Sequence, residues 1–480
     1  MRILRELARC APALLVVASL GATAADDLRL VDAAKRNDAP AVRTLLAQGT
    51  DVDTRQGDGA TALHWAAYGD DMATADVLLQ AGASATAAND LSVTPLWLAS
   101  VNGSAAMVER LLAAGADASV ALPSGETVLM TATRTGSANI TRQLLARGAD
   151  VNARESSQNQ TALMWAAAQG HADVARVLIE AGADLHARAK VRHRRVNTET
   201  AGFGNEVVAE IDRGGFTPLL FAARQGSVET TQVLLAAGAD PKELSPEGTS
   251  ALVVAVHSGH APLAMLLLER GADPNAADGG YTALHVAILH GFVDVATALI
   301  ANGADPNGVL MQGTPVRRAS VDYVISGHYI GATPVWLAAR FAQPEILKHL
   351  LDNGADASVV TDEGEPLLVS AVQGNTRPEV GRTRDQTVTE RLVQECVTLA
   401  VDGGADMNAT DSSGNTALHR AAARRLNSVV EFLVERGATL DAKNEKGQTP
   451  LAMASAGRFN QASSGAENST AELLRKLGAQ

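Results

Sequence analysis

A phrase of about 33 residues returns along most of this chain, and it restricts the possible folds more than any other feature. Its clearest copy covers residues 160–184, QTALMWAAAQGHADVARVLIEAGAD. The apolar residues fall in two groups with helical spacing, and Gly170-His171 separates them. Gly182 follows the second group, where a helix C-terminus needs a left-handed residue. The phrase predicts a helix–turn–helix repeat, which cannot bury its apolar faces without neighbours on both sides.

Those neighbours are present along the sequence. The opening T-x-L, or a close variant, begins at Thr61, Thr94, Thr127, Thr161, Thr217, Ser250, Thr282, Thr333, Glu365, Thr416 and Thr449. The closing G-A-D, or a variant, begins at Gly49, Gly82, Gly115, Gly148, Gly182, Gly238, Gly271, Gly303, Gly354, Gly404, Gly437 and Gly478. A period of this length in so many copies indicates a solenoid in which each repeat contacts only its neighbours.

The wording and the period together resemble the ankyrin repeat. The resemblance implies an all-α solenoid of about twelve helix–turn–helix repeats joined by β-hairpin fingers. It also implies that the usual activity is binding other proteins. The resemblance covers nearly all of the chain after residue 25.

The charge of the chain argues against one class of partner. The formal net charge is −13, whereas general nucleic-acid binding requires a basic surface. Aromatic residues make up only 3% of the chain, so alanine and leucine fill the predicted core. We therefore expect protein partners and no nucleic acid.

Residues 1–25 read as a secretory signal. Arginines precede an apolar run, residues 11–20, that is too short to span a bilayer. Small residues then allow cleavage after Ala24 or Ala25. The alternative is a first helix of the solenoid. With cleavage, the mature protein is periplasmic or secreted, has no membrane span, and keeps Cys396 as its one cysteine.

The remaining residues, 26–480, form the predicted repeat array. Residues 26–57 lack the T-x-L opening and are the expected N-terminal cap, and residues 448–480 the C-terminal cap. Three insertions interrupt the period, at 190–213, 308–331 and 375–389. In the first, 191–198 and 205–212 alternate as the arms of a hairpin, one basic and one acidic. The first two insertions should lengthen fingers on one edge, and the third should project from the opposite edge. They are either harmless loop extensions or partner contacts.

Few residues suggest chemistry. His64, His285 and His419 each follow a Thr by three residues, and the resemblance implies that this pair ties the helix start to the next finger. His257 and His260 invite a metal interpretation, but nothing completes a ligand set. Cys396 lies on an apolar face and reads as a small buried hydrophobe. No nucleophile elbow, P-loop or dinucleotide fingerprint occurs, so we expect no enzyme, metal or cofactor.

The resemblance assigns a concave groove to the ends of the first helices. Four of the assigned positions are arginine, and none is Asp or Glu. Arg and aromatic residues are favoured at interfaces. We hypothesise a basic, aromatic groove that binds an acidic protein segment; the alternative is a solvated face where Arg is only a good helix former. The candidate residues are Tyr68, Arg134, Arg224, Gln225, Leu289, His290, Arg340, Phe341 and Arg424 in the groove, Phe216 and Tyr281 in the fingers, and Arg192, Arg194 and Arg195 in the first insertion.

The function expected from the sequence is an exported, non-catalytic scaffold for protein–protein interaction. Three alternatives remain open at this point. The protein could inhibit a secreted enzyme or toxin, act as an enzyme or small-ligand carrier, or serve in envelope architecture. The identity of the partner and the oligomeric state do not follow from the sequence.

Overall fold

The structure is a computed structural model, and it describes residues 28–198, 207–312, 329–374, 386–455 and 469–480. Of residues 194–198, 207–211 and 386–388 it describes the backbone alone. The predicted signal with Ala24 and Ala25 therefore lies outside the described residues. Within these ranges no helix is long and apolar enough to cross a membrane.

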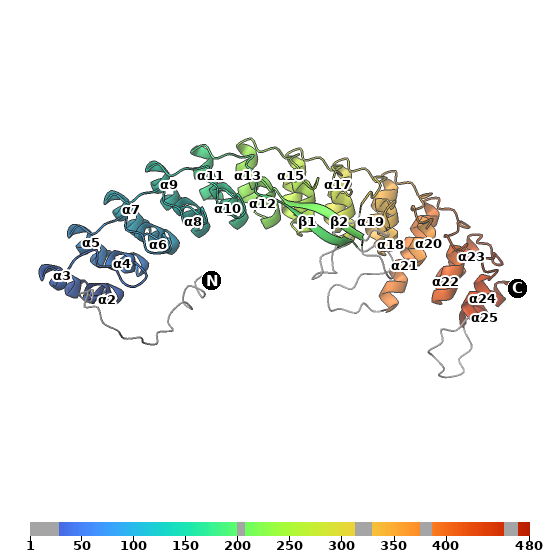
Figure 1. Cartoon of the computed structure of the whole chain (residues 1–480). Coiled ribbons are helices and arrows are strands. Elements are labelled where there is room, and N and C mark those ends of the chain that lie inside the picture. The colour runs from blue at the N-terminus through green and yellow to red at the C-terminus, as the bar shows by residue number, and fades with distance from the viewer. Residues whose placement is uncertain (1–27, 199–206, 313–328, 375–385, 456–468) are drawn as a thin grey trace, which may run out of the picture. The chain divides into compact units, whose positions relative to one another are not determined.

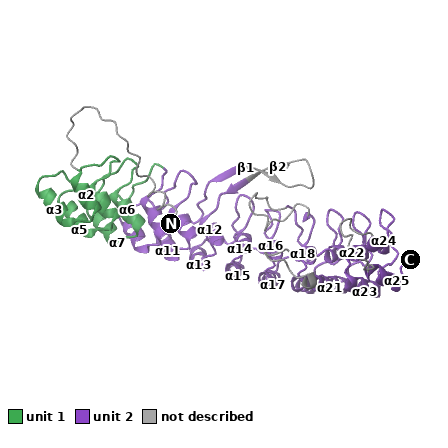
Figure 2. Cartoon of the chain, turned by 90° about the horizontal axis from the view of Figure 1, so that it is seen from below, with its two compact units in different colours: residues 1–123 green, residues 124–480 purple. Residues whose placement is uncertain are grey.

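The chain divides into two compact units, residues 1–123 and 124–480 (Figure 2). The described part of the N-terminal unit consists of three helix pairs. They are α2 (Arg29–Lys35) with α3 (Ala39–Ala47), α4 (Ala62–Tyr68) with α5 (Met72–Gln80), and α6 (Pro95–Asn102) with α7 (Ala105–Ala113). The stretch expected as the N-terminal cap, which lacks a T-x-L opening, contains the helix pair α2 and α3.

The C-terminal unit contains nine further pairs in its described residues. The inner helices are α8 (Val128–Thr135), α10 (Ala162–Gln169), α12 (Pro218–Gln225), α14 (Ala251–His257), α16 (Ala283–His290), α18 (Pro334–Arg340), α20 (Leu367–Val372), α22 (Ala417–Arg424) and α24 (Pro450–Ser455). The outer helices are α9 (Ala138–Ala146), α11 (Ala172–Glu180), α13 (Val228–Ala236), α15 (Ala261–Glu269), α17 (Val293–Ala301), α19 (Pro344–Asp352), α21 (Gln386–Asp402), α23 (Asn427–Glu435) and α25 (Ser469–Lys476). Within each compact unit the inner helices stack in one layer and the outer helices in another (Figure 1). The predicted all-α repeat solenoid is confirmed.

The T-x-L opening forms the helices for a local reason. In the reference repeat, the Thr161 hydroxyl accepts a hydrogen bond from the backbone N–H of Met164 and so caps α10. Gly170 then ends α10 with φ +75°, and Gly182 follows α11 with φ +87°. Both are left-handed conformations that favour glycine.

Polar side chains join successive repeats by binding backbone atoms. His171 Nε2 donates to the carbonyl oxygen of Arg134 at 3.3 Å, and His260 Nε2 donates to that of Arg224 at 3.2 Å. In the fingers, Asn152 donates to Gly182 O at 3.1 Å and accepts from Asp184 N at 2.8 Å. These contacts tie the connector and finger of one repeat to the next.

The first insertion forms a two-stranded antiparallel hairpin, β1 (Val191–Thr198) and β2 (Val207–Gly214). The first strand has the predicted bounds, the second ends two residues later than predicted, and the residues between the strands, 199–206, lie outside the described ranges. At the base of the hairpin, a Cβ on Gly215 (φ +63°) would lie 2.4 Å from Pro246 Cγ, so only glycine fits there. The hairpin lies on the edge that carries the fingers (Figure 2).

The other two insertions are described in part. Residues 313–328 of the second and 375–385 of the third lie outside the described ranges. The structure corrects the end of the third insertion, because α21 begins at Gln386 and the last four residues assigned to it are helical. α21 is 17 residues long, whereas α19 has nine.

Candidate binding surface

The C-terminal ends of the inner helices in the C-terminal unit, here called the inner-helix edge, carry the four predicted arginines. Arg134, Arg224, Arg340 and Arg424 lie at or next to the last residues of α8, α12, α18 and α22. Their surroundings divide them into two kinds.

Arg134 lies over an aromatic ring of the next repeat. Its guanidinium carbon is 5.7 Å from the ring centroid of Trp165, and its Nη1 is 3.9 Å from Glu126 Oε1. The sequence hypothesis missed both neighbours, because they lie outside the positions that it assigned to the groove. The ion pair offsets part of the charge of Arg134, and the cation–π contact holds the guanidinium in place.

Arg224 forms a cluster with two phenylalanines. Its guanidinium carbon lies 5.5 Å from the ring centroid of Phe216 and 5.0 Å from that of Phe221. The two rings meet edge to face, with centroids 5.7 Å apart. Phe221 is buried, Phe216 is half-buried, and Arg224 and the adjacent Gln225 are exposed. The structure thus brings together Phe216 of a finger and Arg224 of a helix end, which were predicted independently.

Arg340 and Arg424 bind the end of the helix that lies between them. Arg340 Nη1 donates to the carbonyl oxygen of Gln373 at 2.8 Å. Arg424 Nη1 donates to the carbonyl oxygens of Val372 and Gly374, the latter at 3.3 Å. These three carbonyls follow or end α20, so both arginines neutralise the negative end of that helix. This structural role explains why arginine stands at both positions without reference to a partner.

Two residues assigned to an exposed groove are buried, so that part of the prediction is wrong. Phe341 is 6% exposed and packs edge to face against Tyr329, with ring centroids 5.9 Å apart. Leu289 is 5% exposed, because α16 is buried along its length from Ala283 to Leu289. The neighbouring His290 is half-buried and stacks on Phe292 at 5.0 Å.

The remaining candidates are scattered. Tyr68, in the N-terminal unit, is 55% exposed and meets the ring of Trp65 edge to face at 5.8 Å. Tyr281 is half-buried. Burial raises its pKa, although a hydrogen bond from Thr249 acts to lower it. Arg192 is exposed on β1, and the structure does not describe the side chains of Arg194 and Arg195. Across the hairpin His193 pairs with Asp212.

The predicted Thr–His pairs are confirmed. In each pair, His Nδ1 accepts from the Thr backbone N–H at 3.1 Å, as in Thr61 with His64, Thr282 with His285 and Thr416 with His419. The other ring nitrogen donates to a finger carbonyl, that of Val93, Gly308 or Gln448. These histidines are bound on both sides and serve the fold.

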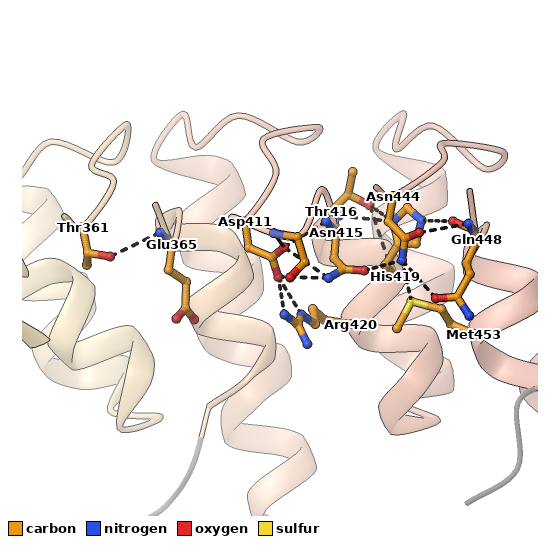
Figure 3. Close-up of polar contacts among 11 residues, drawn as sticks. Thr361, Glu365, Asp411, Asn415, Thr416, His419, Arg420, Asn444, Gln448 and Met453 are labelled. Atoms are coloured by element: carbon orange, nitrogen blue, oxygen red, sulfur yellow. Dashed lines mark hydrogen bonds and ion pairs between the residues drawn. The ribbon is translucent and has the colours of Figure 1, made fainter. Parts of the chain in front are cut away.

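A ladder of polar contacts runs along the finger bases near the C-terminal end (Figure 3). Asp411 forms an ion pair with Arg420 and accepts from Asn415 N at 2.9 Å. Asn444 of the next finger donates to Asn415 Oδ1 at 2.9 Å. Burial acts to raise the pKa of Asp411, but the hydrogen bonds from Asn415 and Arg420 outweigh it and lower the pKa. The polar groups of these residues bind one another, so the ladder joins consecutive fingers.

Of the residues that the sequence suggested for chemistry, His260 is hydrogen-bonded and Cys396 is buried. His260 binds the Arg224 carbonyl, as described above, and no group of three or more metal-binding side chains occurs within the described ranges. Cys396 is fully buried, as its apolar face predicted, and burial raises the pKa of its thiol. A thiol in this setting is poorly suited to act as a nucleophile.

Comparison with known proteins places the repeats in a family. The family description "Ankyrin repeats (3 copies)" matches residues 30–121, 102–189, 219–309 and 389–467, and "Ankyrin repeat" matches residues 330–362.

Individual proteins match over shorter stretches. Neurogenic locus notch homolog protein 1 of Danio rerio is 36% identical over 110 residues, which are 19% of this chain and 4% of that protein. The DNA-binding protein RFXANK of Mus musculus is 46% identical over 52 residues, 11% of this chain and 19% of that protein. The matched part thus spans less than a fifth of either relative. The human ASB11 ankyrin repeat domain has 28% identity and a TM-score of 0.41, and the match covers 51% of this chain and 98% of that one.

Because the family matches run through more than half of the sequence, this chain belongs to the ankyrin repeat family.

Proposed function

We propose that the protein is an exported, non-catalytic scaffold that binds an acidic segment of a protein partner through the inner-helix edge. The observation that carries this proposal is the pair of arginines fixed over aromatic rings, Arg134 on Trp165 and Arg224 on Phe216 and Phe221. Stacking leaves the guanidinium able to bind a carboxylate while its orientation is already fixed, which reduces the entropy lost on binding. Ankyrin repeat proteins typically act in protein–protein interaction.

The two kinds of arginine have unequal parts in this proposal. Arg340 and Arg424 stabilise α20, so replacing them would damage the fold as well as any binding surface. Arg134 and Arg224 lie next to the last residues of α8 and α12 and contact aromatic rings, so they are the residues to test. Tyr68, Tyr281, Gln225, His290 and the hairpin arginines are secondary candidates.

The export part of the proposal rests on residues 1–25, whose charged start, apolar run and small residues suit a cleaved signal. The test is the N-terminal sequence of the protein recovered from the cell envelope and the culture medium. A first residue of Ala25 or Asp26 is expected. An intact Met1 in a cytoplasmic fraction would contradict export.

The binding experiment compares two charge-reversed variants of protein starting at Asp26. One carries Arg134→Glu and Arg224→Glu, and the control carries Arg176→Glu and Arg270→Glu, which change the net charge equally at other exposed sites. Each is used to capture proteins from envelope and culture extracts, and the captured partner is then purified and titrated. We expect the first variant to weaken binding by tenfold or more, about 1.4 kcal/mol.

The controls separate the site from the scaffold role. A partner that binds the Arg134/Arg224 variant as tightly as the unmodified protein would exclude the inner-helix edge. A partner lost equally in both variants would indicate a nonspecific charge effect. Failure to capture a saturable partner would contradict the scaffold function.

A further inference from the structure

The exposed apolar residues of the C-terminal unit are concentrated in two successive fingers. Within its described residues, the large apolar side chains that are exposed are Val309 (46%), Met311 (68%), Ile330 (37%) and Val360 (50%). Val309 and Met311 follow α17, Ile330 precedes α18, and Val360 lies between α19 and α20. Exposed apolar residues scattered singly need no explanation, but a group of four in adjacent loops does.

Backbone contacts hold these fingers side by side. Met311 N donates to Gly280 O at 2.9 Å, so this finger rests on the one before it. Leu310 N donates to Ala332 O at 2.8 Å, which places Ile330 close to Val309 and Met311. A Cβ on Gly331 would lie 2.5 Å from Asp362 Oδ1, so the following finger is in direct contact as well. The four apolar residues therefore belong to one continuous row of fingers.

The described residues of the same row are acidic. Residues 271–312, 329–339 and 350–374 contain no Lys or Arg, whereas Arg317 and Arg318 of the same finger lie outside the described residues. Asp278, Asp305, Asp356 and Asp362 are exposed there, and none of the four forms an ion pair with the described part of the chain. Hydrogen bonds from Ser358 lower the pKa of Asp356 from its ordinary value. This charge is opposite to that of the inner-helix edge.

We propose that these eight residues, here called the acidic finger patch, bind a basic segment of a protein partner in which Lys or Arg alternates with large apolar residues. The apolar side chains gain by removal from water, about 25 cal/mol per Å². The carboxylates around them select cations and repel acidic surfaces. The patch is distinct from the inner-helix edge, so the proposal does not depend on that site.

Charge also argues against a second copy of the chain as the occupant. A two-fold dimer would bring identical patches together and set carboxylate against carboxylate. An anionic membrane surface is disfavoured for the same reason. A basic, apolar protein segment satisfies both the charge and the exposed apolar area.

The probe is a short fluorescent peptide in which Lys and Leu alternate. Two companion peptides carry Glu in place of Lys or Ser in place of Leu. With protein starting at Asp26, we expect saturable binding of the Lys–Leu peptide that weakens as salt screens the carboxylates, and much weaker binding of both companions.

Two variants locate the binding. Met311→Ser with Val360→Ser should weaken Lys–Leu peptide binding about tenfold, or 1.4 kcal/mol. Asp278→Asn with Asp362→Asn should flatten the salt dependence. All four side chains are exposed, so the thermal unfolding of both variants should match that of the unmodified protein. Leu91→Ser, at a 64% exposed site of the N-terminal unit, is the control and should leave binding unchanged.

Four results would overturn the proposal. The first is a failure of the Lys–Leu peptide to show saturable binding at about 1 mM, where the binding free energy is only about 4 kcal/mol. The second is equally tight binding of the Glu–Leu peptide, and the third is an unchanged affinity for the Lys–Leu peptide in the Met311/Val360 variant. The fourth is self-association of the unmodified protein that the Met311/Val360 variant abolishes. The Arg134/Arg224 variant should bind the Lys–Leu peptide normally, so failure of this proposal is distinguishable from failure of the proposed function.

Discussion

At the scale of single residues, His285 shows how a buried polar group links two repeats. Its Nδ1 accepts from Thr282 N at 3.1 Å, and its Nε2 donates to Gly308 O at 3.1 Å. Both bonds fit the neutral ring, with the proton on Nε2. Burial lowers the pKa of His285 from 6.5 to about 4, although the hydrogen bond to Gly308 opposes the shift.

This depressed pKa predicts a loss of stability in acid. The unfolded chain binds a proton at His285 below about pH 6.5, whereas the folded chain does not until about pH 4. The neutral His285 ring therefore makes its full contribution to the stability of the fold above pH 6.5, and this contribution is lost as the pH falls toward 4. We expect the free energy of unfolding to decrease by about 3 kcal/mol at pH 4 from this residue. Urea titrations at a series of pH values measure it.

His285→Met is the matched variant, because Met130 and Met164 occupy the same place in other repeats. It should be less stable at pH 7, since the bond to Gly308 is lost, but its stability should fall less steeply below pH 6.5. An unchanged slope would show that His285 is not the titrating group.

The sequence predicts residues of this kind because their partners are local. Thr282 and His285 are three residues apart at matching positions of the repeat, so the resemblance to ankyrin repeats implies their bond. Phe341 and Leu289 differ, because their burial depends on residues that the repeat pattern does not assign, such as Tyr329. Glu126 and Trp165 were missed beside Arg134 for a related reason, since each lies at another position of the repeat.

At the scale of elements, the ends of the inner helices explain which glycines can be replaced. Gly226 ends α12 at φ +82° and Gly291 ends α16 at φ +72°. A Cβ on Gly226 would lie 2.4 Å from His260 Nδ1, whereas a Cβ on Gly291 would have Gln343 Nε2 as its nearest neighbour, at 3.4 Å. Both positions are left-handed, but only Gly226 is also crowded.

Alanine should therefore destabilise the two positions unequally. Gly291→Ala should lower the stability by about 1 kcal/mol, because alanine is strained in the left-handed conformation. Gly226→Ala adds the displacement of His260 from Arg224 O, and we expect about 2 kcal/mol in total. Urea denaturation of both variants measures the difference. Equal losses would mean that the His260 contact contributes nothing.

Elements were predictable where they follow the repeat and less so where they depart from it. The helix pairs and β1 follow from apolar periodicity and alternation. The start of α21 does not, because its first residues precede the apolar stripe that marks the other outer helices. Arg425 shows a third case: it replaces the turn glycine, yet adopts φ +60° after α22, so the turn geometry survives the substitution.

At the scale of the whole molecule, an array of repeats should transmit damage only over short distances. Leu252 is fully buried in α14, and α14 packs against α12, α15 and α16. Leu252→Ala should cost about 2–5 kcal/mol through the cavity it leaves. We expect faster hydrogen exchange in α12, α14, α15 and α16 and unchanged exchange in α4 and α5, measured by mass spectrometry. Acceleration throughout the chain would indicate a single cooperative unit instead.

The contacts that join consecutive repeats have a consequence for the ancestry of the chain. His260 binds a carbonyl oxygen and Asn152 binds a carbonyl oxygen and an N–H, so each recognises main chain that every neighbour possesses. A junction built in this way does not depend on which side chains the neighbour carries. A duplicated or exchanged repeat would therefore find its joining partners already in place. Genes for such arrays can grow by copying whole repeats, while the exposed positions diverge freely toward new ligands.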